Sequence, residues 1–136
     1  MDEKIIDKLI DQAKSIAEKN FCCKHSNFTV GAALLTKDGK VYKGFNVEND
    51  GIQSICAERV AFTKALSEGN KDFKCIVVVG KPINQKIFNK TTPCGYCRQF
   101  INEYTDKDFK IYTYDDEKQE LYTNTFEDLL PEGFER

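Results

Sequence analysis

The amino-acid sequence predicts an α/β fold in which a mixed sheet of roughly five strands lies between helices, a three-layer α/β/α architecture. Two observations support this prediction. The predicted elements follow the order helix, hairpin, helix, strand, helix, strand, and this alternation is typical of helices that cover both faces of a sheet. The chain has 136 residues, which is about the length of one domain, and no internal repeat, low-complexity segment or linker divides it. We therefore expect a single domain over residues 1–136.

The first third of the chain predicts a helix and a hairpin. Between residues 5 and 17, apolar side chains recur at steps of one, three and four, which is the stripe of an amphipathic helix, and Asp2 is available as its N-cap. Residues 28–36 are rich in apolar and β-branched types, and residues 41–47 also favour a strand. The Asp-Gly pair between these two runs is a tight-turn signal, so the runs predict a hairpin.

Helices and strands alternate in the rest of the chain. Residues 56–68 have a helical apolar face, and Gly69 stands where a helix C-terminus prefers glycine. Residues 75–79 are wholly apolar, which is typical of a strand buried on both faces. Pro93 predicts the start of a helix over residues 94–104, because proline is tolerated in the first helical turn and excluded from later ones. The other predicted elements are strands over 110–114 and 121–125 and a short helix over 126–130.

Composition and charge exclude several classes of protein. Hydrophobic residues make up 40% and charged residues 31% of the chain, a balance that excludes intrinsic disorder, collagen-like repeats and a coiled coil. The 20 basic and 22 acidic residues give a net charge of -2 with no visible basic face, so we expect no nucleic-acid partner. No apolar run approaches the ~20 residues of a membrane span, and a signal-peptide core is absent, so we expect a cytoplasmic protein with no membrane partner.

Three of the six cysteines lie in two short motifs. Cysteines in a reducing compartment more often bind metal, act in catalysis or pack in the core than form disulfides. Cys56 begins the motif Cys-Ala-Glu, and Cys94 and Cys97 lie in Pro-Cys-Gly-Tyr-Cys; each motif falls at a predicted helix start. A helix N-terminus carries about half a positive charge and favours a thiolate. If the two helices start side by side, three sulfurs converge and leave the fourth tetrahedral position of a zinc ion open for water.

Glu58 lies two residues after Cys56 and is predicted to be a proton shuttle rather than a fourth ligand. Zinc can lower the pKa of bound water from ~15.7 to ~7. Three thiolates donate more negative charge than three imidazoles, so we expect a weaker effect here unless charge is withdrawn from sulfur. Arg59 and the two helix termini are predicted to withdraw that charge.

These motifs match the signature of zinc deaminases, in which a glutamate acts as general acid and base beside a Pro-Cys-x-x-Cys pair. The chain resembles the small, homotetrameric cytidine deaminases over nearly its whole length. The matching stretches are residues 28–34, 46–49, 56–59, 93–99 and 129–134.

The resemblance implies a metal site and a reaction. Cys56, Cys94 and Cys97 would bind one zinc ion per chain. Glu58 would take a proton from the metal-bound water and deliver it to the ring N3, and it would next protonate the amino group so that this group leaves as ammonia. The reaction would give uridine from cytidine and deoxyuridine from deoxycytidine, with release of ammonia. Its role would be pyrimidine salvage.

The resemblance also implies a nucleoside pocket. The Ala57 N–H would hold the ring O2, the Thr92 carbonyl would accept from the amino group, and Phe28 would pack on the base. Asn46 and Glu48 would bind the sugar hydroxyls, and the Glu48 carboxylate would repel a phosphate, which favours a free nucleoside. In the family the terminal aromatic, matched here by Phe134, reaches a neighbouring subunit's pocket, so a homotetramer is expected.

The chain departs from the family pattern between Asn49 and Cys56, where it is one residue shorter and lacks a tyrosine, and His25 stands in place of another tyrosine. The altered segment leaves open a deaminase of a related aminopyrimidine nucleoside, such as a nucleoside antibiotic. An alternative of another class is a non-enzymatic binding module. In that module, a fourth sulfur ligand from Cys22 or Cys23 would fill the open coordination position of the zinc.

Overall fold

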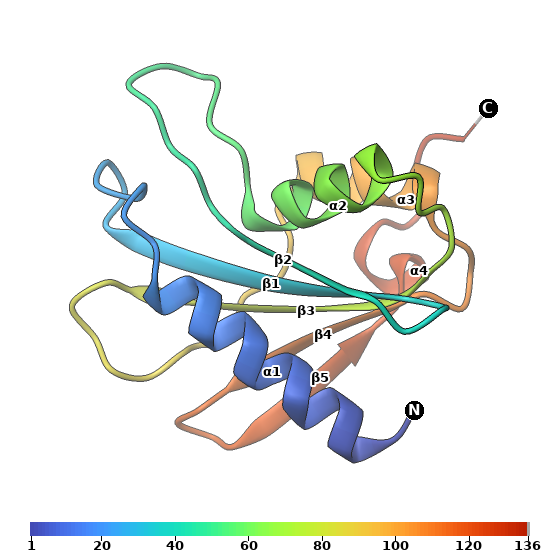
Figure 1. Cartoon of the computed structure of the whole chain (residues 1–136), viewed down its shortest axis with the longest axis horizontal. Coiled ribbons are helices and arrows are strands. Elements are labelled where there is room, and N and C mark those ends of the chain that lie inside the picture. Colours follow the sequence, from blue (N-terminus) through green and yellow to red (C-terminus); the bar gives the residue numbers. More distant parts are fainter. Residues whose placement is uncertain (136) are drawn as a thin grey trace.

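A computed structural model describes residues 1–135 of the chain. Helix α1 lies on one face of a sheet, and α2 and α3 lie on the other, which gives the three layers expected from the sequence (Figure 1). The helices are α1 (Glu3–Glu18), α2 (Ala57–Ser67), α3 (Gly95–Tyr104) and α4 (Phe126–Leu129), and the strands are β1 (Phe28–Thr36), β2 (Val41–Phe45), β3 (Phe73–Pro82), β4 (Lys110–Asp115) and β5 (Glu120–Asn124).

The five strands form one mixed sheet in the order β2-β1-β3-β4-β5. Strands β1 and β2 pair as the predicted antiparallel hairpin, and β1 also pairs antiparallel with β3. The only parallel pair in the sheet of residues 1–135 is β3 with β4, which α3 connects. The mixed α/β architecture predicted from the sequence is therefore confirmed.

Helix α1 approaches the sheet closely. Asp2 caps the helix by accepting a hydrogen bond from the Lys4 N–H, as the sequence predicts. A Cβ atom added at Gly31 of β1 would lie 2.0 Å from the carbonyl oxygen of Ala13, so only glycine permits this contact between helix and strand. The buried side chains of α1 are Ile6, Leu9, Ile10, Ala13 and Ala17.

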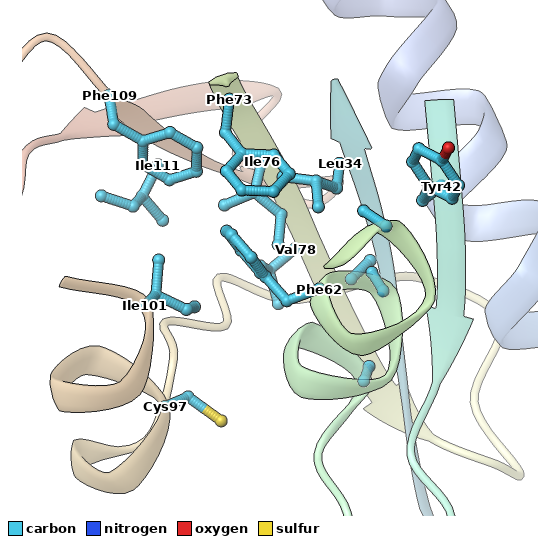
Figure 2. Close-up of a cluster of buried hydrophobic side chains, with 14 of the residues drawn as sticks. Leu34, Tyr42, Phe62, Phe73, Ile76, Val78, Cys97, Ile101, Phe109 and Ile111 are labelled. Atoms are coloured by element: carbon cyan, nitrogen blue, oxygen red, sulfur yellow. The ribbon is translucent and has the colours of Figure 1, made fainter. Parts of the chain in front are cut away.

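The opposite face of the sheet carries a core built around aromatic side chains. Phe62 of α2 packs edge-on against Phe73 of β3, with ring centroids 4.9 Å apart. Figure 2 shows Phe62 and Phe73 beside Ile76 and Val78 of the sheet, with Ile101 and Cys97 of α3 bordering the same cluster. This core holds the N-terminal ends of α2 and α3 on one face of the sheet.

Most element boundaries differ from the sequence prediction by one or two residues or more, and three of the differences have a clear structural cause. Strand β2 ends at Phe45 rather than at residue 47, because the Asn46 side chain accepts the hydrogen bond of the Val30 N–H that a strand backbone would accept. Strand β3 extends to residues 73–82 because β1 pairs along its length. Helix α3 begins at Gly95 with Cys94 as N-cap, so Pro93 precedes the first turn instead of lying within it. Within residues 1–135, no helix is long and apolar enough to cross a membrane.

Candidate active site

Three cysteine thiols meet where α2 and α3 begin. Cys56 is the N-cap of α2 and Cys94 the N-cap of α3, and Cys97 lies in the first turn of α3. The three Sγ atoms all lie within 4.8 Å of one another, and those of Cys56 and Cys94 are 3.7 Å apart. Neither N-cap side chain bonds to its own helix, so both sulfurs remain directed to the cluster. Three soft donors at this spacing fit one zinc ion.

Cys22 and Cys23, the alternative fourth ligands, lie away from this cluster. Within residues 1–135, the group of His, Cys, Asp and Glu side chains that could hold a metal contains only Cys56, Cys94 and Cys97. The backbone carbonyl of Cys22 instead accepts a hydrogen bond from the Glu48 N–H, and Cys23 is buried. A site with three sulfur ligands leaves one tetrahedral position for water, which is the arrangement of a catalytic zinc centre.

Hydrogen bonds and a nearby cation favour the charged form of one thiol. A hydrogen bond from Cys97, assisted by Arg59 and Cys94, lowers the pKa of Cys56 to about 5 against the opposing effect of burial. Arg59 Nη2 lies 3.8 Å from Cys56 Sγ and donates to the Ser54 carbonyl at 3.2 Å. The Arg59 guanidinium also lies 4.3 Å from the centre of the Tyr96 ring. Contacts with α3 and with the segment before α2 therefore hold this cation beside the sulfurs.

Glu58 is the buried carboxyl group beside the thiols. It lies in the first turn of α2 and is only 3% exposed. Burial raises the pKa of Glu58 to about 7, and the neighbouring Cys56 thiolate adds to that rise, while a hydrogen bond from its own backbone N–H opposes it. A carboxyl group with a pKa near neutrality can both accept and release a proton, which is the property expected of a proton shuttle.

A cavity of about 290 Å³ opens beside the thiols, and it is lined by most of the site residues predicted from the sequence. Its walls include the expected Phe28, Asn46, Glu48, Ala57, Glu58 and Thr92, together with Cys56 and Cys94. Sequence reasoning missed five further lining residues, Ser26, Val30, Ser54, Ile55 and Thr91. Val30 lies within the matched stretch 28–34, and the other four lie within two residues of a matched stretch, which was the available signal for them.

Glu48 and Asn46 are fixed at one end of this cavity by hydrogen bonds. The Glu48 carboxylate accepts from the backbone N–H groups of His25 and Ser26 and from the Ser26 hydroxyl. Although burial raises the pKa of Glu48, these hydrogen bonds outweigh that effect and hold the pKa below its usual value. Asn46 Nδ2 lies 3.4 Å from Glu48 Oε2, so an amide donor and a carboxylate acceptor stand side by side.

Arg98 ties the Thr92 wall of the cavity to the C-terminal segment. Its guanidinium donates to the Thr92 hydroxyl and to the carbonyls of Pro93 and Leu129. Phe134 lies outside the cavity of its own chain, and the residue is 67% exposed.

Comparison with known proteins identifies relatives along most of the chain. A family model described as the cytidine and deoxycytidylate deaminase zinc-binding region matches residues 3–113. A protein of Dictyostelium discoideum named probable cytidine deaminase is 42% identical over 132 residues, covering 96% of this chain and 84% of that protein. A blasticidin-S deaminase of Bacillus cereus is 33% identical over 111 residues, covering 79% of this chain and 77% of that protein.

A solved structure has the same fold. The crystal structure of cytidine deaminase from Burkholderia pseudomallei superimposes with a TM-score of 0.82 at 36% sequence identity, covering 98% of this chain and all of that chain (100%). The matched region contains the three thiols and the buried carboxyl group described above. The chain therefore belongs to the family of the cytidine and deoxycytidylate deaminase zinc-binding region.

Proposed function

We propose that this protein is a zinc-dependent enzyme that deaminates cytidine and deoxycytidine to uridine and deoxyuridine with release of ammonia. The observation that carries the proposal is the cluster of three thiols at two helix N-termini, with the buried Glu58 carboxyl group at the same cavity. The relatives named above support the choice of substrate.

The thiols of Cys56, Cys94 and Cys97 would hold the zinc ion. When bound, zinc supplies a water molecule acidified enough to act as a nucleophile near neutral pH. Arg59 reduces the negative charge on the sulfurs through its contact with Cys56. Less charge on sulfur leaves the metal a stronger Lewis acid.

Glu58 moves the protons of the reaction. Deamination requires protonation of the ring N3 before attack at C4, and protonation of the amino group before the C4–N bond breaks. A carboxyl group whose pKa burial has raised to about 7 can carry out both transfers at neutral pH, since each of the two protons it passes on originates from the attacking water. Its burial also keeps bulk water from competing for these protons.

The cavity walls would orient the base. Ala57 is the first residue of α2, so its N–H has no acceptor within the helix and is free to bind the ring O2. The Thr92 hydroxyl accepts from Arg98, and the Thr92 carbonyl would accept from the substrate amino group. Phe28 lines the cavity and would pack on the base.

Asn46 and Glu48 would bind the sugar. Their hydrogen bonds leave an amide donor beside a carboxylate acceptor, a pair that suits hydroxyl groups. The carboxylate would also repel a 5'-phosphate in a partly desolvated cavity. We therefore assign free nucleosides, rather than nucleotides or nucleic acids, as the substrates.

The proposed setting is pyrimidine salvage in the cytoplasm, carried out by a homotetramer. None of the six cysteines forms a disulfide within residues 1–135. The exposed Phe134 ring is suited to enter the cavity of a neighbouring subunit.

A nucleoside antibiotic is the second candidate substrate. The resemblance to a blasticidin-S deaminase and the shortened segment before Cys56, of which Ser54 and Ile55 line the cavity, favour this possibility. A competition assay in which blasticidin S is added to the cytidine reaction separates the two, since the better substrate suppresses turnover of the other.

Ammonia release by the purified protein from a panel of aminopyrimidine nucleosides tests the proposal. We expect cytidine and deoxycytidine to give the highest kcat/KM values, in a sample whose measured zinc content is close to one per chain. A zinc-loaded protein that releases ammonia from no member of the panel would contradict the proposal.

A further inference from the structure

The orientation of the Asn46 side chain is imposed by two backbone groups of β1 and by the Asn20 amide. Its Oδ1 accepts from the Val30 N–H at 2.8 Å and from Asn20 Nδ2 at 2.7 Å. Its Nδ2 donates to the Phe28 carbonyl at 3.0 Å. A backbone N–H can only donate and a carbonyl can only accept, so the opposite orientation of the amide would place like groups together on both sides. Asn46 can therefore present only its second N–H to the cavity, where Nδ2 lies 3.4 Å from Glu48 Oε2.

Asn20, which lies just after α1, has its own amide fixed by the same reasoning. The Cys22 N–H donates to Asn20 Oδ1 at 2.7 Å, which leaves Nδ2 to face Asn46. There Nδ2 contacts Asn46 Oδ1 at 2.7 Å and the Asn46 carbonyl at 3.1 Å, and it lies 3.2 Å from the Thr29 hydroxyl. The Asn20 amide thus binds both the side chain and the backbone of Asn46.

Asn20 lies on the side of Asn46 away from the substrate cavity. It is absent from the residues that line that cavity, whereas Asn46, Glu48 and Phe28 all line it. Asn20 instead lines a separate depression next to the end of α1. Asn20 therefore reaches the nucleoside cavity only through neighbours: directly through Asn46, and less directly through Cys22, whose carbonyl accepts from the Glu48 N–H.

We propose that Asn20 is a positioning residue for nucleoside binding: its amide holds Asn46 so that the N–H of Asn46, beside the Glu48 carboxylate, faces the sugar. The inference rests on the proposed role of Asn46 in sugar binding. Without the Asn20 contact, Asn46 keeps its bonds to Val30 and Phe28, but one acceptor site on Asn46 Oδ1 is unfilled and the side chain is held less tightly. The loss of Asn20 should therefore weaken nucleoside binding and leave the rate of the chemical step nearly unchanged.

Two single substitutions test Asn20 itself. Asn20→Ala removes the whole amide, and Asn20→Asp keeps the acceptor for the Cys22 N–H but presents a carboxylate to the Asn46 oxygens. We expect each to raise the KM for cytidine by about three- to tenfold, the loss typical of one hydrogen bond, with kcat changed by less than about twofold. Asn70→Asp is the matched control, because Asn70 bonds Tyr42 beyond the far end of α2 and should leave KM unchanged.

A double-mutant cycle with Asn46→Ala distinguishes positioning from a general structural role. If Asn20 acts through Asn46, adding Asn20→Ala to the Asn46→Ala protein should change KM by less than about twofold, because the group being positioned is already gone. Zinc content and thermal midpoint are measured for all four proteins, and kinetics are run well below the lowest midpoint.

The KM values distinguish failure of the positioning role of Asn20 from failure of the sugar-binding role of Asn46. If Asn20→Ala multiplies KM by the same factor with and without Asn46, or if Asn20→Asp leaves KM unchanged, the positioning role is overturned while the sugar site stands. If Asn46→Ala alone leaves the KM for cytidine at the wild-type value, the proposed role of Asn46 fails and the inference fails with it.

Discussion

Glu58 is the residue on which the proposed chemistry most depends, and its environment explains why. A carboxyl group in the first turn of a helix is normally stabilised in its charged form by the helix dipole. Here burial and the nearby Cys56 thiolate oppose that effect and raise the pKa of Glu58 to about 7. The fold thus converts an ordinary acidic residue into a group that can give and take a proton.

Glu58→Gln should leave zinc binding intact and lower kcat for cytidine by about 10²- to 10⁴-fold, the usual contribution of a general acid–base group. Glutamine preserves the shape of the side chain but cannot transfer the proton. Zinc content and steady-state rates are measured on the same sample. Glu68→Gln, at the C-terminal end of α2, is the control and should keep wild-type kinetics. Comparable turnover in Glu58→Gln would remove Glu58 from the mechanism.

Ser26→Ala should weaken nucleoside binding at acid pH. The Ser26 hydroxyl is one of the hydrogen bonds that hold the pKa of Glu48 down. Because the pKa of Glu48 is lowered in the native protein, the carboxylate persists as pH falls and is lost only below its ordinary range. Removing the hydroxyl moves that loss to higher pH.

Titration of uridine binding against pH measures this shift without involving proton transfer. The Kd of the Ser26→Ala protein should begin to rise at a higher pH than that of the wild type, whereas Ser67→Ala, which loses a hydroxyl in the last turn of α2, should follow the wild type. Superimposable profiles for Ser26→Ala and wild type would show that Ser26 does not tune Glu48.

At the scale of elements, the start of α2 is set by its close packing on β2. A Cβ atom added at Gly44 would lie 2.8 Å from the Ala57 carbonyl oxygen and 2.9 Å from the Ala61 nitrogen. Both are backbone atoms, so the helix itself would have to move. The same turn of α2 carries Cys56 and Glu58 into the cavity, and the position of the strand therefore affects the geometry of the site.

Gly44→Ala should destabilise the fold by about 1–3 kcal/mol, the usual cost of overpacking. It should also lower zinc affinity, because α2 carries one ligand and α3 the other two. Denaturant unfolding and competition with a zinc chelator measure the two effects. Gly95→Ala, where an added Cβ meets no atom within 4 Å, is the control for stability. An unchanged unfolding free energy in Gly44→Ala would contradict the packing argument.

Local signals in the sequence predicted the elements and the three thiols, because helix starts, turns and apolar runs depend on neighbours in the chain. Asp2 does cap α1, and both cysteine motifs begin helices. The cavity wall was harder to predict. Whether Val30 and Ile55 face the cavity depends on how β1 and the segment before α2 meet in space. The Asn20–Asn46 contact spans 26 residues, and no local pattern encodes it.

At the scale of the whole molecule, the exposed C-terminal aromatic is the feature that points to assembly. The Phe134 backbone is held by Gln99, whose amide accepts from the Phe134 N–H at 3.2 Å and donates to the Phe134 carbonyl at 3.1 Å. These contacts involve no part of the ring. The ring is therefore presented outward from an anchored segment.

The protein should sediment as a homotetramer, and Phe134→Ala should raise the KM for cytidine while leaving zinc content unchanged. The substitution removes the ring but keeps the backbone contacts with Gln99. Phe134→Leu retains an apolar side chain and should raise the KM for cytidine by a smaller factor. Analytical ultracentrifugation and steady-state kinetics on the same samples provide the test. A stable monomer with full activity would contradict both the tetramer and the proposed place of Phe134.

The central claim is that Cys56, Cys94 and Cys97 hold a zinc ion with one coordination position left for solvent. X-ray absorption at the zinc edge of the purified protein tests it most directly. The claim predicts three sulfur neighbours at about 2.3 Å and one oxygen at about 2.0–2.2 Å. A spectrum that requires four sulfur neighbours, or a purified protein that binds no zinc, would contradict it.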